Sequence, residues 1–567
     1  MPPSSEPTQT RESGAASPAF TAAVCALSLL GLALFVQTIL ESAELSLAFL
    51  SEPRWRSVVS AFGGRITTTE AGPLATVSLG ASAGWALLHG LALTALGALL
   101  QGAESPLLDR LLTTARRLSR AWAPAGIWWL LWITALLSGW TSLASVLHET
   151  ADLTVALCLA LSALAVLPRA PRLLPSGPGA SRWSLQPKTV LAAGILLYVV
   201  VFTAMNWGLW FNLRIPHGDS AMYEEHLWNL EHGKGFRSYL DQGLFLGEHL
   251  QVVHVLLVPI HALFPSHLTL ELAQSIILAL GAWPVFNIAR RHSGSEWAAA
   301  LLGLAYLAYF PLQYLDIAID LKTFRPNSFG IPTLLVAIDL LERRRYGWAT
   351  FWLAITLSAQ EDWAIPIALL GAYFAVHAFC TSRPNPSPRA QLDDSVPSTG
   401  EKVAEGRMRG QRTPATPESL ANRRQLIFGI GLFLFSIAYL WFALNVVIPW
   451  FRGGATVHTA SYFSKFGNSP REIIVTLLTD WPLVFSTIVT PAALVYALRL
   501  LLPIGFLPLR SPGRLLVAAP LFLLLLMNDL AMQVPAPVHH FHAPLIPILF
   551  WAAASGLGTK VALKQST

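Results

Sequence analysis

The sequence predicts an all-α membrane protein, a polytopic bundle of transmembrane helices. Of its 567 residues, 54% are hydrophobic and only 12% are charged, whereas soluble domains carry about 25% charged residues. The mean hydropathy is +0.52, and apolar stretches of about 18 or more residues, long enough to cross a bilayer, recur along the chain. The pI of about 9.3 does not indicate a nucleic-acid partner, because cytoplasmic loops of membrane proteins collect Lys and Arg.

About fourteen apolar runs qualify as spans. The first is too long for a typical signal-peptide core, so we interpret it as a retained anchor. The runs 328–341 and 347–359 are shorter than the roughly 20 residues of a straight span, but short helices occur inside bundles that shield them. The predicted spans are residues 19–40, 74–100, 121–147, 152–168, 189–211, 269–289, 295–313, 328–341, 347–359, 363–380, 425–449, 482–503, 514–530 and 541–558.

The distribution of Lys and Arg predicts that both termini are cytoplasmic, because alternate loops are basic. This topology places residues 215–250, 314–327, 450–480 and 531–540 on the outer side. Arg54, Arg56 and Arg65 fall in a loop predicted to be outside and do not follow the rule. Outside the 381–424 segment, the basic residues on the predicted cytoplasmic side are Arg110, Arg116, Arg117, Arg120, Arg169, Arg172, Arg182, Lys188, Arg290, Arg291, Arg343, Arg344, Arg345, Arg510, Arg514, Lys560 and Lys564.

We divide the chain into an accessory region, a membrane core and a short tail. Residues 1–188 hold about four spans with few ionisable side chains, and residues 189–558 form the core. The segment 381–424 interrupts the core and is rich in Pro, Ser and charge. It cannot bury enough apolar surface to fold, so we expect a disordered cytoplasmic linker. Residues 559–567 form a cytoplasmic tail.

The three cysteines, Cys25, Cys158 and Cys380, lie in or at the end of apolar runs. They offer neither a disulfide framework nor a paired metal spacing, and we expect small packing residues. The sequence motifs do not call for a cofactor. A divalent cation stays open, because carboxylates and His are suitable ligands, although no compact H-x-x-x-H or D-x-D motif is present.

Ionisable side chains gather in five clusters on the predicted outer side. Such groups are costly at membrane level and usually face a cavity or each other. Solvated loop positions are the alternative, which we prefer for Glu231 and Lys234, and an interfacial belt is the alternative for the C-terminal histidines. The stretch with His254 and His261 is predicted as a helix along the outer surface. The clusters are Asp219, Glu224 and Glu225; Glu248, His249 and His254; Asp316, Asp320, Lys322 and Arg325; Glu361 and Asp362; and His539, His540 and His542.

Five short motifs together resemble the prokaryotic membrane-protein family known as domain of unknown function 2079. They are "DSAMYEEHLWN" from Asp219, "GEH" ending at His249, "FRP" from Phe324, "ED" at Glu361, and "HFHAP" from His540. The resemblance covers about 190–558. The family pattern has Gln, His and Lys where this chain has Glu225, Arg325 and Gln360.

That family is similar to GT-C glycosyltransferases, which transfer sugars from polyprenyl-phosphate donors. The similarity implies a GT-C-like core in the bacterial plasma membrane, with an extracytoplasmic catalytic loop after the span 189–211. Asp219 would then take the proton of the acceptor hydroxyl, and Glu361 would orient the acceptor or the base. Lys322 and Arg325 would hold the donor phosphate. The other implied substrate-binding residues are Glu224, Glu225, His249, Asp320, Asp362, His540 and His542.

Two other functions stay open at this point. A transporter or flippase would use charges at midplane depth and broken helices, whereas these charges gather on one side and no repeated halves are evident. A non-catalytic envelope-assembly protein would carry scattered, solvated loop charges. The expected partners of the enzyme are a membrane lipid and a polyprenyl-phosphate-linked sugar.

Overall fold

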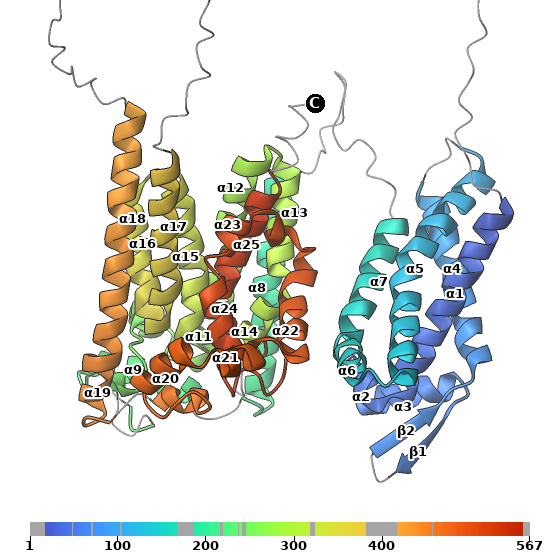
Figure 1. The fold of residues 1–567 in the computed structure, drawn as a ribbon, viewed down its shortest axis with the longest axis horizontal. Coiled ribbons are helices and arrows are strands. Elements are labelled where there is room, and N and C mark those ends of the chain that lie inside the picture. Colours follow the sequence, from blue (N-terminus) through green and yellow to red (C-terminus); the bar gives the residue numbers. More distant parts are fainter. Residues whose placement is uncertain are drawn as a thin grey trace, which may run out of the picture. The chain divides into compact units, whose positions relative to one another are not determined.

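The computed structural model describes residues 18–47, 49–69, 72–101, 105–166, 186–215, 219–235, 238–240, 245–317, 324–381, 417–455 and 458–558. It is built almost entirely of helices (Figure 1). The chain divides into two compact units, Met1–Ser184 and Leu185–Thr567. Each unit is described by itself.

The first unit is a helical bundle with one short hairpin. Its two longest helices, α1 and α5, pass so close that a Cβ on Gly31 would lie 2.8 Å from the Cα of Gly126. The ring centroids of Phe35 and Trp128 are 5.0 Å apart in the core of this bundle. Its elements are α1 (Pro18–Glu41), α2 (Ala43–Leu47), α3 (Glu52–Ala61), β1 (Arg65–Thr69), β2 (Gly72–Thr76), α4 (Leu79–Leu100), α5 (Leu107–Leu137), α6 (Thr141–Glu149) and α7 (Ala151–Val166).

The hairpin corrects two expectations from the sequence. The strands β1 and β2 pair antiparallel, with Arg65 opposite Thr76, so the chain is not purely helical. The predicted span 74–100 also begins too early, because α4 starts at Leu79. The strand β1 has the sequence RITTT, and β-branched residues favour extended structure. Apolar content alone did not reveal this preference.

The basic stretch before residue 121 is helical rather than a loop. The helix α5 extends from Leu107 to Leu137, and the chain then turns at Gly139, whose φ is 71°. Its first half, LLDRLLTTARRLSRAW, is rich in Leu, Arg and Ala, which have high helix propensity. The predicted span 121–147 is therefore the second half of α5 followed by the short helix α6.

The second unit contains most of the chain and the larger hydrophobic core. Short 3₁₀ segments and one π-helical turn, Ala443–Val447, connect several of its helices. Its α-helices are α8 (Pro187–Phe211), α9 (Asp219–Glu231), α10 (Val258–His261), α11 (His267–Leu280), α12 (Ala282–Ser293), α13 (Glu296–Leu307), α14 (Phe310–Ile317), α15 (Gly330–Glu342), α16 (Tyr346–Ala359), α17 (Ala364–Thr381), α18 (Pro417–Phe442), α19 (Ile448–Phe451), α20 (Pro470–Thr479), α21 (Trp481–Ile488), α22 (Pro491–Leu501), α23 (Pro512–Leu515), α24 (Ala519–Met527) and α25 (Leu545–Gly556).

The described residues include six helices long and apolar enough to cross a membrane, or up to nine if each bent pair of helices counts as one span. A multi-pass helical membrane protein is thus confirmed, whereas the predicted fourteen spans are not. Several predicted spans correspond to short helices, such as α15 and α16. The outer faces carry exposed apolar side chains, including Leu88 and Leu99, as expected of surfaces that contact lipid.

The helices α17 and α18 flank the predicted linker and pack directly on each other. A Cβ on Gly371 would lie 2.7 Å from the carbonyl oxygen of Gly429, and a Cβ on Gly429 would lie 2.6 Å from that of Gly371. Glycine at both positions is what lets the two backbones approach so closely. The helix α18 begins at Pro417, at a position where proline is favoured, so the last eight residues of the predicted 381–424 linker are helical. Residues 382–416 lie outside the described residues.

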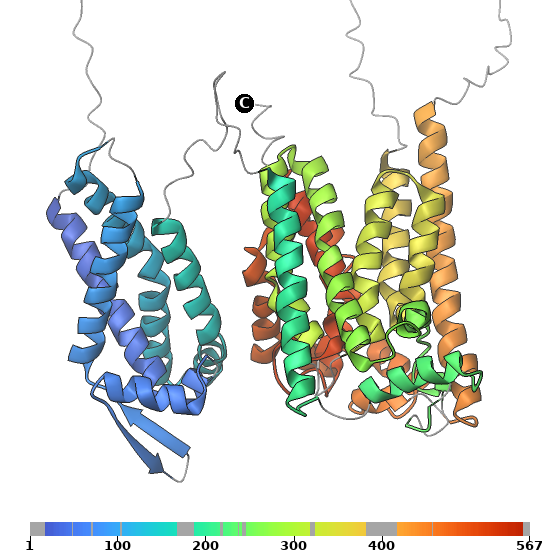
Figure 2. The ribbon, with the colours of Figure 1, turned by 180° about the vertical axis from the view of Figure 1, so that it is seen from behind.

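The two ends of the second unit differ in their charges. We call the end at which α17 finishes and α18 begins the linker end, and the opposite end the α9 end (Figures 1 and 2). At the linker end, Glu342 accepts hydrogen bonds from Arg291 and Trp551 at 2.8 Å each, from His292 at 3.1 Å and from Arg514 at 3.4 Å. Residues predicted to be cytoplasmic therefore gather at this end.

Candidate functional site

The helix α9 lies across its end of the second unit (Figure 2). It begins at Asp219, the first residue of the motif that the sequence analysis selected. Ser220, Tyr223 and Leu227 follow one another at a spacing of three or four, so they share one face of the helix, and all three are buried. Glu224 is only partly exposed. The helix thus turns one face of this motif toward the bundle.

A cavity of about 290 Å³ lies where α8 ends and where α9 and α11 begin. One part of its wall is apolar and comes from the end of α8 and the residues after it. The other part is polar and comes from α9 and α11. The lining residues are Trp210, Leu213, Ile215, Ser220, Ala221, Glu224 and His267. The cavity thus presents an apolar surface and titratable groups side by side.

The imidazole of His267 is the most enclosed titratable group of this cavity wall. Its exposed fraction is 1%, and its Nε2 lies 2.7 Å from Oε1 of Glu271, which is fully buried one turn further along α11. The indole of Trp210 stacks on the imidazole with 5.4 Å between ring centroids. Nδ1 lies 3.9 Å from Oε2 of Glu224. A histidine therefore lies between a buried carboxylate and a carboxylate of the cavity wall.

A second pair of titratable groups lies at the α9 end, between His249 and Glu361. His249 Nδ1 donates to Oε1 of Glu361 at 2.8 Å, and the backbone N–H of Leu250 donates to Oε2 at 2.8 Å. Both oxygens of Glu361 thus fix the 249–250 segment, and the side chain is only 7% exposed. Glu361 begins the short 3₁₀ helix Glu361–Trp363, which joins α16 to α17.

Neighbouring carboxylates raise the pKa of His249 above its ordinary value. Burial opposes protonation of the imidazole, but the charge and hydrogen bond of Glu361, together with the charges of Asp362 and Glu248, outweigh burial. The surrounding carboxylates therefore stabilise the protonated imidazolium of His249, because nearby opposite charges favour the charged form.

A chain of neutral hydrogen bonds connects α9 to the same region. The Tyr223 hydroxyl donates to Oε1 of Gln251 at 2.8 Å, and Nε2 of Gln251 donates to Oε1 of Gln360 at 2.7 Å. All three side chains are buried. Buried polar groups need such partners, since an unpaired one costs about 1–3 kcal/mol. This chain fixes α9 against the segment that carries Glu361.

Two buried histidines, His226 and His254, lie beside the ring of Tyr223. Nδ1 of His226 lies 3.3 Å from Nε2 of His254, and their rings are stacked at 5.5 Å between centroids. Burial lowers the pKa of His254 well below its ordinary value, and His226 lowers it further. The sequence analysis predicted a surface helix here, but His254 is fully buried in a short 3₁₀ helix, Val253–Leu257. This segment is buried because it packs against the side of α9 that carries Tyr223 and His226.

The "FRPN" segment is fixed to the bundle from both sides. The backbone N–H of Arg325 donates to Oε1 of Gln274 at 2.7 Å, and the indole N–H of Trp363 donates to Oδ1 of Asn327. Arg325 itself is only 7% exposed. This arrangement places Arg325 beside α11, on which the His267–Glu271 pair also lies.

The structure brings some of the predicted residues together and leaves others apart. His249, Glu361 and Asp362 meet, whereas Glu224 lines the α8–α9 cavity. Asp320 and Lys322 lie outside the described residues, as does the side chain of Asp219. The roles that the resemblance implies for Asp219, Lys322, Arg325 and Glu361 in one site therefore stay predictions.

Three further predicted residues have identifiable contacts. Glu225 accepts a hydrogen bond from the Ser238 hydroxyl. Nε2 of His542 lies 2.8 Å from the carbonyl oxygen of Pro311, and the imidazole is fully buried. His540 packs against Phe541, with ring centroids 4.4 Å apart. Among the described residues, no group of three His, Cys, Asp or Glu side chains is arranged to hold a metal ion.

Sequence reasoning missed the residues that lie behind the cavity. His267 and Glu271 stand at the start of the predicted span 269–289, and neither was selected as a candidate. Their spacing of four was a usable signal, because side chains four apart on a helix are neighbours. Their burial could not be inferred without knowing that Trp210 and α9 cover them.

Comparison with known proteins identifies a family but no characterised relative. No curated protein and no solved structure matches the chain. The model of the family described as predicted membrane protein (DUF2079) matches residues 212–566. That range begins just before α9 and includes the cavity residues from Leu213 onward together with the His249–Glu361 pair. The chain therefore belongs to the DUF2079 family of predicted membrane proteins.

Proposed function

We propose that the protein transfers a sugar from a polyprenyl-phosphate donor to a hydroxyl acceptor at the α8–α9 cavity. The observation that carries the proposal is the divided wall of this cavity. Trp210, Leu213 and Ile215 offer apolar surface at the end of a span, and Glu224 and His267 offer titratable groups opposite them. A lipid-linked sugar needs both, because its lipid stays in the membrane while its anomeric carbon reacts at the polar edge.

The chemistry requires one group to accept a proton. The acceptor oxygen attacks the anomeric carbon as its proton is removed, and a positioned base typically contributes about 10²–10⁴-fold to the rate. The sequence pattern predicts Asp219 for this role, and the cavity wall itself contains Glu224 and His267. Direct displacement of this kind would invert the anomeric centre.

The donor phosphate needs cations or hydrogen-bond donors. Lys322 and Arg325 remain our candidates, because guanidinium groups bind phosphate with two parallel hydrogen bonds. Glu361 has a different proposed role from the one predicted from the sequence. Because it accepts from His249 and Leu250, we propose that it fixes the segment after α9 and does not touch the substrate.

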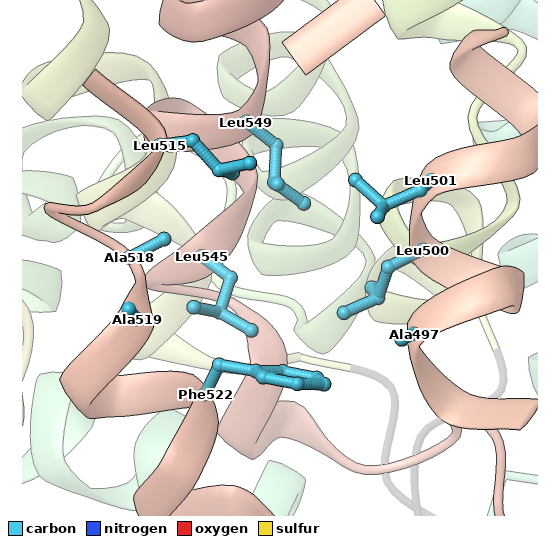
Figure 3. Close-up of a pocket in the computed structure, with 9 residues that line it drawn as sticks. All are labelled: Ala497, Leu500, Leu501, Leu515, Ala518, Ala519, Phe522, Leu545 and Leu549. Carbon is cyan, nitrogen blue, oxygen red and sulfur yellow. The ribbon is translucent and has the colours of Figure 1, made fainter. Parts of the chain in front are cut away.

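A purely apolar pocket elsewhere in the second unit offers no such chemistry. It lies between α22, α24 and α25, and only Ala, Leu and Phe side chains line it (Figure 3). It has room for hydrocarbon, but no group that could bind a phosphate or a sugar. We therefore locate the reaction at the α8–α9 cavity, on the outer side of the bacterial plasma membrane, with both termini cytoplasmic.

The test is a transfer assay on the purified full-length protein in lipid nanodiscs. Radiolabelled polyprenyl-phosphate sugars are incubated with the protein and a membrane extract as acceptor source, and donor loss and labelled product are measured. We expect loss of at least one donor. Absence of donor loss with every sugar, in the presence of extract, would reject the transferase.

A proton-coupled transporter is the second candidate, and one observation favours it. Glu271 on α11 and Asp316 on α14 are both fully buried in helices that belong to candidate spans. Ionisable residues within spans often mark proton relays. Proteoliposomes loaded with a pH-sensitive dye would decide: substrate-driven proton flux that Glu271→Gln abolishes, without any donor loss, would support transport.

A further inference from the structure

The pair formed by His267 and Glu271 places a buried carboxylate beside an imidazole of the cavity wall. The helix α11 starts at His267, where the Ser266 hydroxyl caps it by accepting from the backbone N–H of Leu268. Glu271 follows one turn later, on the same face. The pair is therefore held by regular helical structure and not by a loop.

The imidazole is restrained on three sides. Nε2 lies 2.7 Å from Oε1 of Glu271, and Trp210 covers one ring face at an interplanar angle of 21°. The side of Nδ1 faces Glu224, 3.9 Å away, which lines the cavity with His267. A carboxylate beside one imidazole nitrogen stabilises the positive charge that the ring gains when its other nitrogen takes a proton.

We propose that His267 is the catalytic base of the α8–α9 cavity and that Glu271 stabilises its protonated form. This inference rests on the proposed transferase function. It assigns the acceptor proton to His267 rather than to Asp219 or Glu224. The acceptor is a hydroxyl group, and it occupies the space between Glu224 and the imidazole.

The step is balanced in atoms and charge. The acceptor oxygen forms a bond to the anomeric carbon, and its proton moves to Nδ1 of His267. The bond from the anomeric carbon to the phosphate oxygen breaks, and the polyprenyl phosphate leaves with the electron pair. The imidazolium then returns its proton to water through the open cavity.

Burial makes Glu271 effective in this role. Before the reaction a carboxylate lies beside a neutral imidazole, and after proton transfer the two form an ion pair in a region of low dielectric. Attraction between opposite charges is stronger there than in water. Glu271 has an exposed fraction of 0%, so it stabilises the charge that develops on His267.

The chain contains a matched control pair. Nδ1 of His261 lies 2.7 Å from Oε1 of Glu231, and the side chain of His261 is 1% exposed. This pair joins α9 to α10 and does not line the cavity. The variant His261→Gln therefore measures how much kcat falls when a buried histidine–carboxylate contact outside the cavity is lost.

The experiment measures donor loss and donor binding separately for each full-length variant in nanodiscs. With donor identity established for the wild type, we expect His267→Gln to lower kcat by about 10²–10⁴-fold at nearly unchanged donor Kd. Glu271→Gln should lower kcat less, with the same donor Kd. His261→Gln, whose pair does not line the cavity, should keep a kcat within about tenfold of the wild type.

Chemical rescue distinguishes a base from a structural residue. Replacing His267 with Ala leaves space beside the cavity, and added imidazole should restore part of the lost kcat in proportion to its concentration. Rescue would support the assignment, and its absence would overturn it. A wild type that consumes donor while His267→Gln remains fully active would also overturn it, with the transferase intact. A wild type that consumes no donor would instead reject the transferase.

Discussion

His249 and Glu361 are 112 positions apart in the sequence, yet Nδ1 of the first lies 2.8 Å from Oε1 of the second. The contact joins the segment after α9 to the start of α17. It also makes the stability of this end of the protein depend on pH, because the neighbouring carboxylates raise the pKa of His249.

The first prediction follows from the sign of that shift. A group whose pKa is higher in the folded state stabilises the fold below its ordinary pKa, here 6.5, and the contribution is lost as the pH rises through the folded pKa. His249→Gln should therefore lower the melting temperature most on the acidic side. A hydrogen bond to a charged group contributes about 1.5–3 kcal/mol.

Thermal unfolding in detergent, followed between about pH 5.5 and pH 8.5, measures this difference. The exposed His232 provides a control, since its imidazole lies 2.7 Å from the backbone oxygen of Trp228 and stacks on the ring of that nearby residue. A melting-temperature difference between His249→Gln and the wild type that grows with pH would contradict the assignment.

The second prediction concerns the linker end. Glu342 accepts from four side chains and is 10% exposed, and removing one partner of a buried ion pair costs about 3–5 kcal/mol. Glu342→Gln should therefore lower the melting temperature clearly. Glu296→Gln is the matched control, because that carboxylate is 44% exposed beside Arg290 and such pairs contribute about 0–1 kcal/mol. Equal shifts for both variants would refute the role of Glu342.

The third prediction uses two glycines of α18 that lie two residues apart. A Cβ on Gly429 would clash with the backbone of α17, whereas a Cβ on Gly431 would meet nothing within 4 Å. Gly429→Ala should destabilise the protein by about 1–3 kcal/mol through overpacking. Gly431→Ala should be neutral or stabilise it by up to about 1 kcal/mol. The melting temperatures of the two variants are compared by thermal unfolding. A lower melting temperature for Gly431→Ala than for Gly429→Ala would refute the close approach of α17 and α18.

The fourth prediction concerns sidedness. Tyr239 is 78% exposed at the α9 end, and Arg345 is exposed at the linker end, between α15 and α16. In a variant without its three native cysteines, an impermeant thiol reagent applied to intact cells should label Tyr239→Cys and spare Arg345→Cys. Labelling of Arg345→Cys alone would invert the topology and move the cavity to the cytoplasmic side.

The sequence predicted a multi-pass helical membrane protein correctly, but not the number of spans. The motifs at Asp219 and Glu361 were found because charged residues beside apolar runs are conspicuous. The hairpin β1–β2 and the helical start of α5 were missed, because hydropathy does not distinguish extended from helical backbone in short polar stretches. The His267–Glu271 pair was missed because its enclosure depends on Trp210, which comes from another helix.

The glycine contact between α17 and α18 has a consequence for how the family can vary. Gly371 and Gly429 determine how closely α17 and α18 approach each other. Contact between their backbones therefore fixes how these two helices, which precede and follow residues 382–416, are aligned. Insertions or deletions within that segment leave the crossing unchanged. A change in the length or composition of that segment should therefore leave the geometry of the α9 end unchanged.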